Sequence, residues 1–219
     1  MDERADIINV ECSEPEGKIV RSVKLAALSK ERMAFLWDKL KDFDTLFNDF
    51  VKDDYKAFVS HFILEYEGQP VPTGLLWDVD DVGIFFLNNI IPHQSASAHF
   101  TFWDQRFRGR EQLCIEMLRY VFDAYKFQRI QVEIPLYAYH THDAIEKLGF
   151  VQEGRIRKAI LYHDRWFDII IYSVLPHEVG QSRSSWSTRR TVCIECGDVF
   201  SDKKKKTKTN SEEISNGRA

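Results

Sequence analysis

Three arginines surround a single glycine in the stretch AHFTFWDQRFRGREQL, residues 98–113. Arg106, Arg108 and Arg110 supply guanidinium groups, which bind phosphate oxygens in pairs. Gly109 lacks a Cβ, so it allows close approach to the backbone and unusual φ angles. A strand-like run precedes the stretch and a helix-like pattern follows it, which adds the free N–H groups of a helix start. The pattern predicts a pyrophosphate-binding loop, with an ordinary exposed turn as the alternative.

Few side chains near this loop could move a proton during catalysis. Asp104 stands where the preceding strand should end, and Glu133 and Tyr137 share one face of the next strand by two-residue alternation. His99 is a further candidate. Tyr137 is the preferred general acid because it follows Pro135, where the ladder must stop. Each residue also has a structural alternative: Asp104 as a loop cap, Glu133 as a cross-strand partner of an arginine, and His99 and Tyr137 as packing residues.

Hydrophobic periodicity predicts the elements that position these residues. Their order is β, α, α, several β, then βαβα and a final hairpin, with Ser29 and Thr141 as helix N-caps and Gly149 at a helix end. The predicted elements are a strand over 18–28, helices over 30–43 and 44–53, antiparallel strands over 57–92, a strand over 95–104, a helix over 111–127, a strand over 129–135, a helix over 141–150, and strands over 153–163 and 165–175 that turn at Asp164 and Arg165.

Composition and charge describe a globular chain of 219 residues, of which 44% are apolar. The net charge is −4, but residues 181–219 carry +4, so the remainder carries −8 and is poorly suited to binding nucleic acid. An acidic start without a membrane-length apolar run predicts a cytoplasmic protein with no membrane role. Cys12 and Cys114 do not suit a disulfide scaffold. Cys193 and Cys196 form only half of a zinc ribbon, so no metal is expected.

Two segments carry a resemblance to a known family. Arg106, Arg108 and Gly109 occupy the place of a Q/R-x-x-G-x-G/A loop, and EKLGFVQEGRIR (Glu146–Arg157) looks like an EKLGF..EG signature. The order and spacing resemble the GNAT superfamily of acetyl-CoA-dependent N-acyltransferases, especially its ribosomal-protein N-acetyltransferase branch, over about residues 19–175. The resemblance implies an α+β fold, the GNAT-like acyl-CoA N-acyltransferase fold, with a mixed central sheet and helices on both faces.

The domain organisation follows from the resemblance and the composition together. We expect an N-terminal extension over 1–18, a GNAT-like domain over 19–178, and a basic, flexible tail over 179–219 with a single CxxC. The resemblance implies that acetyl-CoA donates an acetyl group to a primary amine, on a protein N-terminus or a small molecule, by direct attack in a ternary complex. The alternative is a non-catalytic binding module of the same fold, whose tail contacts RNA or a protein.

The resemblance also implies which residues meet the coenzyme. In the family, the strands before and after the first helix splay apart and hold the pantetheine arm. The corresponding amides here belong to Phe102, Trp103 and Asp104, one of which would polarise the thioester carbonyl. Arg106, Arg108, Gly109 and Arg110 would hold the pyrophosphate, and Thr141 would keep a hydroxyl contact.

Three positions depart from the family's pattern. Glu111 replaces the loop's last small residue, and Ala138 replaces a likely asparagine contact with the coenzyme. Ile145 stands where many members place a tyrosine that acts as the general acid. An acid must therefore come from elsewhere in this chain, or from water.

Overall fold

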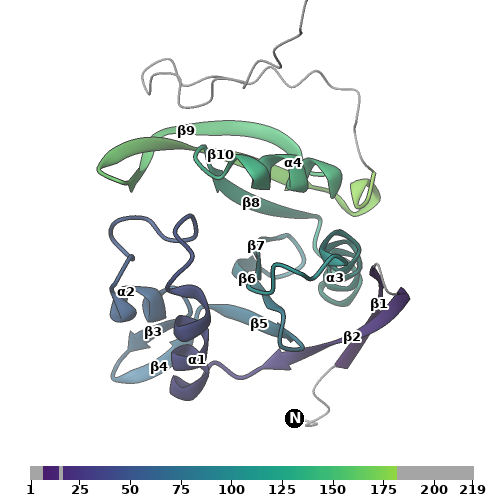
Figure 1. Cartoon of the computed structure of the whole chain (residues 1–219), viewed down its shortest axis with the longest axis horizontal. Coiled ribbons are helices and arrows are strands. Elements are labelled where there is room, and N and C mark those ends of the chain that lie inside the picture. Colours follow the sequence, from purple (N-terminus) through teal and green to yellow (C-terminus); the bar gives the residue numbers. More distant parts are fainter. Residues whose placement is uncertain (1–6, 15–16, 182–219) are drawn as a thin grey trace, which may run out of the picture. The chain divides into compact units, whose positions relative to one another are not determined.

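The computed structural model describes residues 7–14 and 17–181, which form a mixed eight-stranded sheet with helices on both faces (Figure 1). The sheet order is β1-β2-β5-β6-β7-β8-β10-β9, and only β7 and β8 run parallel. β3 and β4 form a separate hairpin. The strands are β1 (Ile7–Glu14), β2 (Gly17–Ala26), β3 (Ile63–Tyr66), β4 (Gln69–Pro72), β5 (Gly74–Val79), β6 (Gly83–Ile91), β7 (Ser95–Phe102), β8 (Arg129–Pro135), β9 (Val151–Tyr162) and β10 (Arg165–Val174).

The helices divide between the two faces of the sheet, as alternation along β5 and β6 shows. Leu76 and Phe86 pack with α1 and α2, whereas Trp77 and Phe85 pack with α3 and α4. The predicted fold class is therefore confirmed. No described helix is long and apolar enough to cross a membrane. The helices are α1 (Lys30–Leu40), α2 (Tyr55–Ser60), α3 (Arg110–Tyr125), α4 (Tyr139–Lys147) and the 3₁₀ helix η1 (Pro176–Glu178).

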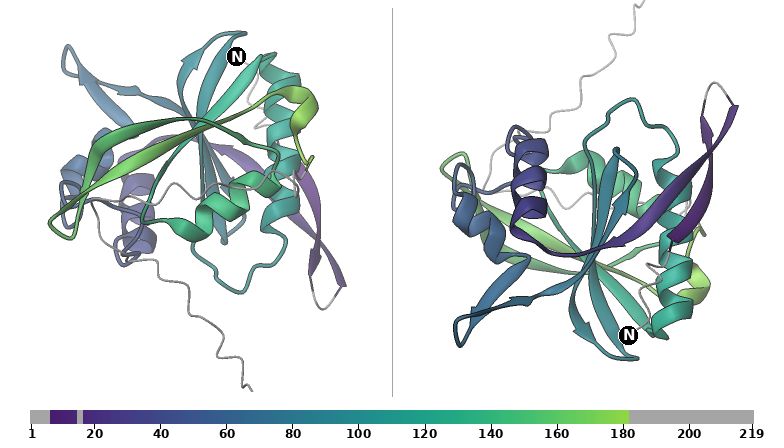
Figure 2. Two further views of the ribbon diagram at one scale, coloured as in Figure 1. Left: turned by 90° about the horizontal axis from the view of Figure 1, so that it is seen from above. Right: turned by 90° about the horizontal axis from the view of Figure 1, so that it is seen from below.

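The N-terminal segment differs from its expectation, because it contributes an edge strand to the sheet. β1 pairs antiparallel with β2 and lies beside α3 (Figure 2). Val10 and Cys12 are 2% and 0% exposed, whereas Asn9 and Glu11 are exposed. This two-residue alternation is the pattern of a half-buried strand, and it was present in the sequence.

The helix predicted over 44–53 is wrong. These residues form turns, and the helix α2 begins later, at Tyr55, and continues into residues that were expected to be strand. Asn48 Oδ1 accepts the backbone N–H of Phe50 at 2.9 Å, which competes with helical hydrogen bonding. Asp54 is the N-cap of α2 and accepts the N–H of Ala57 at 2.9 Å.

The remaining differences lie at element ends. The β9–β10 turn is formed by His163 and Asp164, whose φ angles of 49° and 59° are typical of a two-residue hairpin turn. α4 begins at Tyr139 after Ala138, so Thr141 is not its N-cap. Gly149 follows α4 with a φ of 100°, as expected for a glycine that ends a helix. Predictions for Cys193, Cys196 and the basic run lie outside the described residues.

Candidate active site

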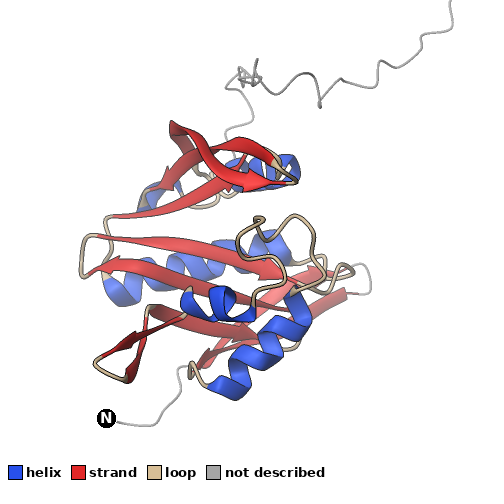
Figure 3. Cartoon of the chain, turned by 90° about the vertical axis from the view of Figure 1, so that its left-hand side faces the viewer, coloured by secondary structure: helices blue, strands red, loops and turns tan. Residues whose placement is uncertain are grey.

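The two parallel strands separate along their length. β7 and β8 pair only from Ser95 with Arg129 to Ser97 with Gln131. Beyond these pairs, β7 continues against β6 and β8 continues against β10. Residues 98–102 therefore have no ladder partner on β8, and the two halves of the sheet diverge (Figure 3). The opening implied by the family resemblance is present.

Only some of the predicted backbone amides face this opening. The N–H groups of Trp103 and Asp104 both donate to the Val82 carbonyl, at 3.0 and 3.3 Å. N–H groups alternate between the two edges of a strand. Those of Phe102 and Phe100 therefore point toward the opening. The sequence-based prediction did not include the Phe100 amide. Its direction follows from strand alternation only once the Val82 carbonyl is known to accept the Trp103 N–H.

Asp104 and Trp103 organise the surrounding chain. The Asp104 carboxylate accepts the Arg106 N–H at 2.9 Å, and its carbonyl accepts the Phe107 N–H at 3.2 Å. The bonds from the Arg106 backbone and guanidinium lower the pKa of Asp104. A carboxylate held in its charged form is a weak base. The Trp103 indole donates to the Asp81 carbonyl, and its ring meets that of Phe35 edge-on.

The arginines of the loop face different ways. Phe107 is 2% exposed and anchors the loop, which leaves Arg106 and Arg108 on either side of it facing solvent. Arg110 instead turns inward. Its Nη2 donates to the Asp104 carbonyl at 2.8 Å, and its guanidinium lies 6.0 Å from the ring centroid of Phe102. Arg110 therefore braces the loop. Arg106 bonds Asp104 through Nε at 3.3 Å, but its side chain is 93% exposed, so its Nη groups and the Arg108 guanidinium are available to a ligand.

Position 109 requires glycine for a different structural reason from the one predicted. Its φ of −74° is ordinary, so no unusual backbone conformation requires glycine. A Cβ there would lie 2.5 Å from the Cβ of Cys12 and 2.9 Å from Cε2 of Phe107. The glycine is required because β1 and the loop's own phenylalanine press against it.

The start of α3 presents unpaired backbone donors. Gly109 is the N-cap and makes no side-chain capping bond. Within the described chain, no acceptor lies opposite the N–H groups of residues 108–112. Such a cluster, with the positive end of a 16-residue helix behind it, attracts anions. Together with Arg106 and Arg108, it forms a site that can hold more than one phosphate.

The face of the sheet that carries α1 and α2 holds two other candidates. His99 pairs in register with Phe86, and its Nε2 lies 3.1 Å from Oδ1 of Asn88. Glu133 stands two residues beyond the last β7–β8 pair, as does His99, so the two lie across the opening from one another. Glu133 is exposed, and no described residue makes an ion pair with it.

Tyr137 lies in an aromatic stack. Its ring centroid is 3.9 Å from that of Tyr162, and it meets Phe167 edge-on. Burial, with the nearby Tyr162, Asp49 and Asp44, raises the pKa of Tyr137 to about 12. A hydroxyl with this pKa is a weaker general acid than one tuned toward neutrality. Thr141 is exposed in the first turn of α4, and Ile145 is buried in the core.

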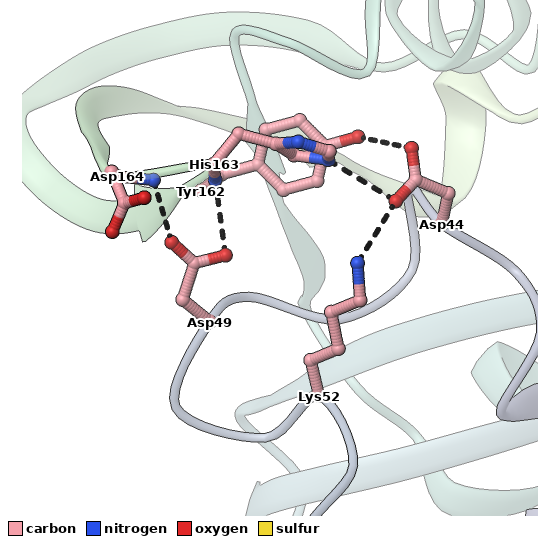
Figure 4. A network of polar contacts seen from close by, with 6 residues as sticks. All are labelled: Asp44, Asp49, Lys52, Tyr162, His163 and Asp164. Atoms are coloured by element: carbon pink, nitrogen blue, oxygen red, sulfur yellow. Dashed lines mark hydrogen bonds and ion pairs between the residues drawn. The ribbon is translucent and has the colours of Figure 1, made fainter.

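A polar network that sequence reasoning missed joins the α1–α2 loop to the β9–β10 turn (Figure 4). Asp49 accepts the backbone N–H groups of His163 and Asp164 at 3.0 and 2.8 Å. Asp44 accepts the Tyr162 hydroxyl at 2.9 Å and lies 3.1 Å from Nε2 of His163. These partners are more than 100 residues apart in the sequence, so no local pattern could predict their contacts.

Sequence comparison finds one distant relative. No protein-family model matches the chain. A Bacillus subtilis protein named "Putative ribosomal N-acetyltransferase YdaF" is 23% identical over 112 residues, which cover 49% of this chain and 61% of that protein. The match therefore spans less than two thirds of the relative's length.

Structural comparison identifies the fold. RimJ of Mycobacterium smegmatis, solved in complex with CoA-disulfide, has a TM-score of 0.56 at 14% identity, over 80% of this chain and 90% of that one. A GNAT acetyltransferase of Bacillus anthracis has a TM-score of 0.53 at 16% identity, over 78% and 100%. A chimera of spermidine N-acetyltransferase SpeG, from Vibrio cholerae and hSSAT, has a TM-score of 0.54 at 18% identity, over 71% and 96%. The chain has the GNAT acetyltransferase fold, and the predicted resemblance is confirmed at the level of the fold.

Proposed function

We propose that this protein is an N-acetyltransferase that moves an acetyl group from acetyl-CoA to a primary amine. The observation that carries the proposal is the opened edge of β7, where free backbone donors lie between an anion site and the last β7–β8 pair. The five residue-to-residue steps from Ser97 to Phe102 span about 16 Å of extended strand. A diphosphate at one end and a thioester near the other fit this spacing.

The residues present fit the coenzyme. The N–H groups at the start of α3, with Arg106 and Arg108, would hold the pyrophosphate. The N–H groups of Phe100 and Phe102 would bond the extended arm, and the donor nearer the last β7–β8 pair would polarise the thioester carbonyl. Thr141 would add a hydroxyl from α4. When bound, the coenzyme supplies an activated acetyl group.

A primary amine is the acceptor class that this chemistry serves. YdaF is named as a ribosomal N-acetyltransferase and SpeG as a spermidine N-acetyltransferase, and RimJ was solved in complex with CoA-disulfide. These names support an amine on a protein N-terminus or on a small molecule. The attacking nitrogen must lose a proton first, because an α-amine has a pKa of about 8 and a lysine of about 10.4. Direct attack then needs a base on the acceptor side of the opening.

A non-catalytic binding module is the second candidate, and two observations favour it. Ile145 is 6% exposed in the core, where the family's tyrosine acid would stand. Asp104 is tied into the loop by its hydrogen bonds. Such a module would hold the coenzyme without turning it over.

A two-stage measurement separates these functions. Calorimetric titration of the full chain with acetyl-CoA should show binding at one site. Thiol release should then rise above the amine-free rate when mixed primary amines are added. Binding without amine-dependent thiol release would support the module, and absence of binding would contradict both.

A further inference from the structure

A groove of about 630 Å³ opens on the α1–α2 face of the sheet. It lies between the end of α2, the hairpin strand β3 and the end of β6. One of its residues, Asn88, pairs in register with Ser97, the last residue of β7 that pairs with β8. The groove therefore ends beside the point where the opening begins. Its lining includes Ser60, His61, Leu64, Thr73, Asn88 and Asn89.

His99 adjoins this groove through Asn88, one of the residues that line it. Its backbone follows Ser97 by two residues, so both side chains project from the same face of β7. The Nε2 atom lies 3.1 Å from Asn88 Oδ1, and the ring lies 5.9 Å from the ring of Phe86. A carboxamide oxygen can only accept, so Nε2 carries the proton. The lone pair of Nδ1 is then available to take a proton.

We infer that this groove is the acceptor site, that it takes a primary amine flanked by uncharged groups, and that His99 removes the amine's proton there. This inference rests on the proposed acetyltransferase function. It names the base and the class of acceptor, which the fold and the relatives leave open.

The electrostatic surroundings keep the imidazole neutral. Desolvation in the crowded part of the sheet face, and then the nearby His61, lower the pKa of His99 below its ordinary value, although one edge of the side chain stays exposed. Burial also lowers the pKa of His61. The titratable groups facing His99 are His61 from α2 and Glu133 from β8, whereas β6 contributes the neutral Asn88 and Phe86. At pH 7 the imidazole is therefore unprotonated and can accept a proton, although the lowered pKa makes it a weaker base than a free imidazole.

The lining also discriminates between amines. No carboxylate is among the residues that line the groove in the described chain. His61 offers no negative charge, and Leu64 presents an aliphatic surface. A polyamine would bring a second ammonium group into this groove without a counter-charge, which is costly. An N-terminus followed by a small or apolar residue, or a monoamine, would not.

The proposed step balances in atoms and charge. Nδ1 of His99 takes one proton from the ammonium form of the acceptor. The nitrogen lone pair then forms a C–N bond to the thioester carbon, and the C–S bond breaks. The leaving thiolate takes the second proton from the nitrogen, which gives the amide and a free thiol. The imidazolium releases its proton to solvent.

The test of the base uses His99→Gln, with His177→Gln as the matched control on an exposed histidine of η1. We expect kcat at pH 7 to fall on the order of 100-fold in His99→Gln, with activity recovering at high pH as the amine loses its own proton. Calorimetric affinity for acetyl-CoA should be unchanged in both variants. A wild-type pH profile in His99→Gln would overturn the inference while leaving the acetyltransferase function intact.

A second variant reports on the same residue without removing it. Asn88→Asp places a carboxylate beside Nε2, which raises the pKa of the imidazole. Because the base acts in its neutral form, the acid limb of kcat/KM should move to higher pH. An unmoved limb would contradict the assignment. If the wild-type chain binds acetyl-CoA but acetylates no amine, the proposed function fails and the inference fails with it.

The acceptor class is tested by competition between a peptide with a free N-terminal alanine and spermidine. The wild-type kcat/KM should favour the peptide. Leu64→Glu adds a carboxylate at the groove and should shift the ratio toward spermidine at least several-fold, whereas Tyr66→Glu, on the same strand but outside the groove lining, should not. Preference of the wild-type chain for spermidine would overturn the stated class of acceptor.

Discussion

The arginine loop over 104–111 and the proposed acceptor side of the opening are built in different ways. In the loop, hydrogen bonds join residues two to six positions apart, such as Asp104 with Arg106 and Arg110. Beside the proposed acceptor groove, Asn88 on β6 contacts His99 on the neighbouring strand β7. In the polar network of Figure 4, Asp44 contacts His163, which lies 119 positions along the chain. A local motif thus shapes the proposed coenzyme end, whereas contacts between separate elements shape the proposed acceptor end. The same fold can therefore keep the arginine loop while the residues on the proposed acceptor side vary.

The largest effect that would test this contrast is expected at the coenzyme end. In Arg106→Glu/Arg108→Glu, two exposed guanidinium groups are replaced by charges that repel phosphate. We expect the affinity for acetyl-CoA to fall on the order of 100-fold or more, since each charge-assisted bond contributes about 1.5–3 kcal/mol. Isothermal titration at two salt concentrations measures the loss, and the affinity of the wild-type chain should itself decrease with salt.

A charge reversal at the other end of the same helix provides the control. Lys126→Glu changes net charge in the same direction but lies beyond the C-terminus of α3. The affinity of the Lys126→Glu variant for acetyl-CoA should stay within a few-fold of the wild-type affinity. Equal losses in this control and in Arg106→Glu/Arg108→Glu would show that overall charge, rather than the loop, governs binding.

A smaller effect is expected from Gly109→Ala, and it separates packing from coenzyme contact. The added methyl group would lie 2.5 Å from Cys12 Cβ, an atom that cannot move away without a shift of the β1 backbone. Overpacking of this kind costs about 1–3 kcal/mol. We expect the melting temperature of the coenzyme-free protein to fall. If the melting temperature is unchanged and only coenzyme affinity falls, the glycine serves the ligand and the packing explanation is wrong.

The same contrast explains how far the sequence could be interpreted. Periodicity and the RFRGRE and EKLGF segments were enough to predict the GNAT fold, the splayed strands and the arginine loop, because their signals are local. The role of Gly109 was not accessible, since Cys12 meets it only after β1 joins the sheet. The helix predicted over 44–53 was wrong for a similar reason, as Asp49 gives its N–H to Leu161 on β9. His99 was only one candidate among several until Asn88 was placed beside it.

The smallest expected effect concerns the tether between the α1–α2 loop and the β9–β10 turn. Asp49→Asn weakens the acceptor of two backbone N–H groups, those of His163 and Asp164. Amide hydrogen exchange over 161–165 should speed up several-fold at pH 7, with little change in β7 or α3. Asp53→Asn, in the same loop, is the control, because no described residue makes an ion pair with that carboxylate. Equal exchange in the two variants would show that Asp49 does not hold the turn.

The pH dependence of this tether follows from the same bonds. The bonds from the Asp164 and His163 backbone lower the pKa of Asp49, and those from Tyr162 and His163 lower the pKa of Asp44. A carboxyl with a depressed pKa in the folded state stabilises it above the ordinary value of about 3.9, and this contribution disappears as pH falls through the folded-state pKa. Protection of the His163 and Asp164 amides, corrected for intrinsic exchange rates, should therefore persist at pH 5 and decrease below about pH 4.

Because the arginine loop depends on Asp104, whose pKa is also lowered, both regions should loosen in acid. At neutral pH, Asp49→Asn should speed exchange in the tether but not in the arginine loop. This difference distinguishes the long-range contacts of the tether from the local hydrogen bonds of the arginine loop.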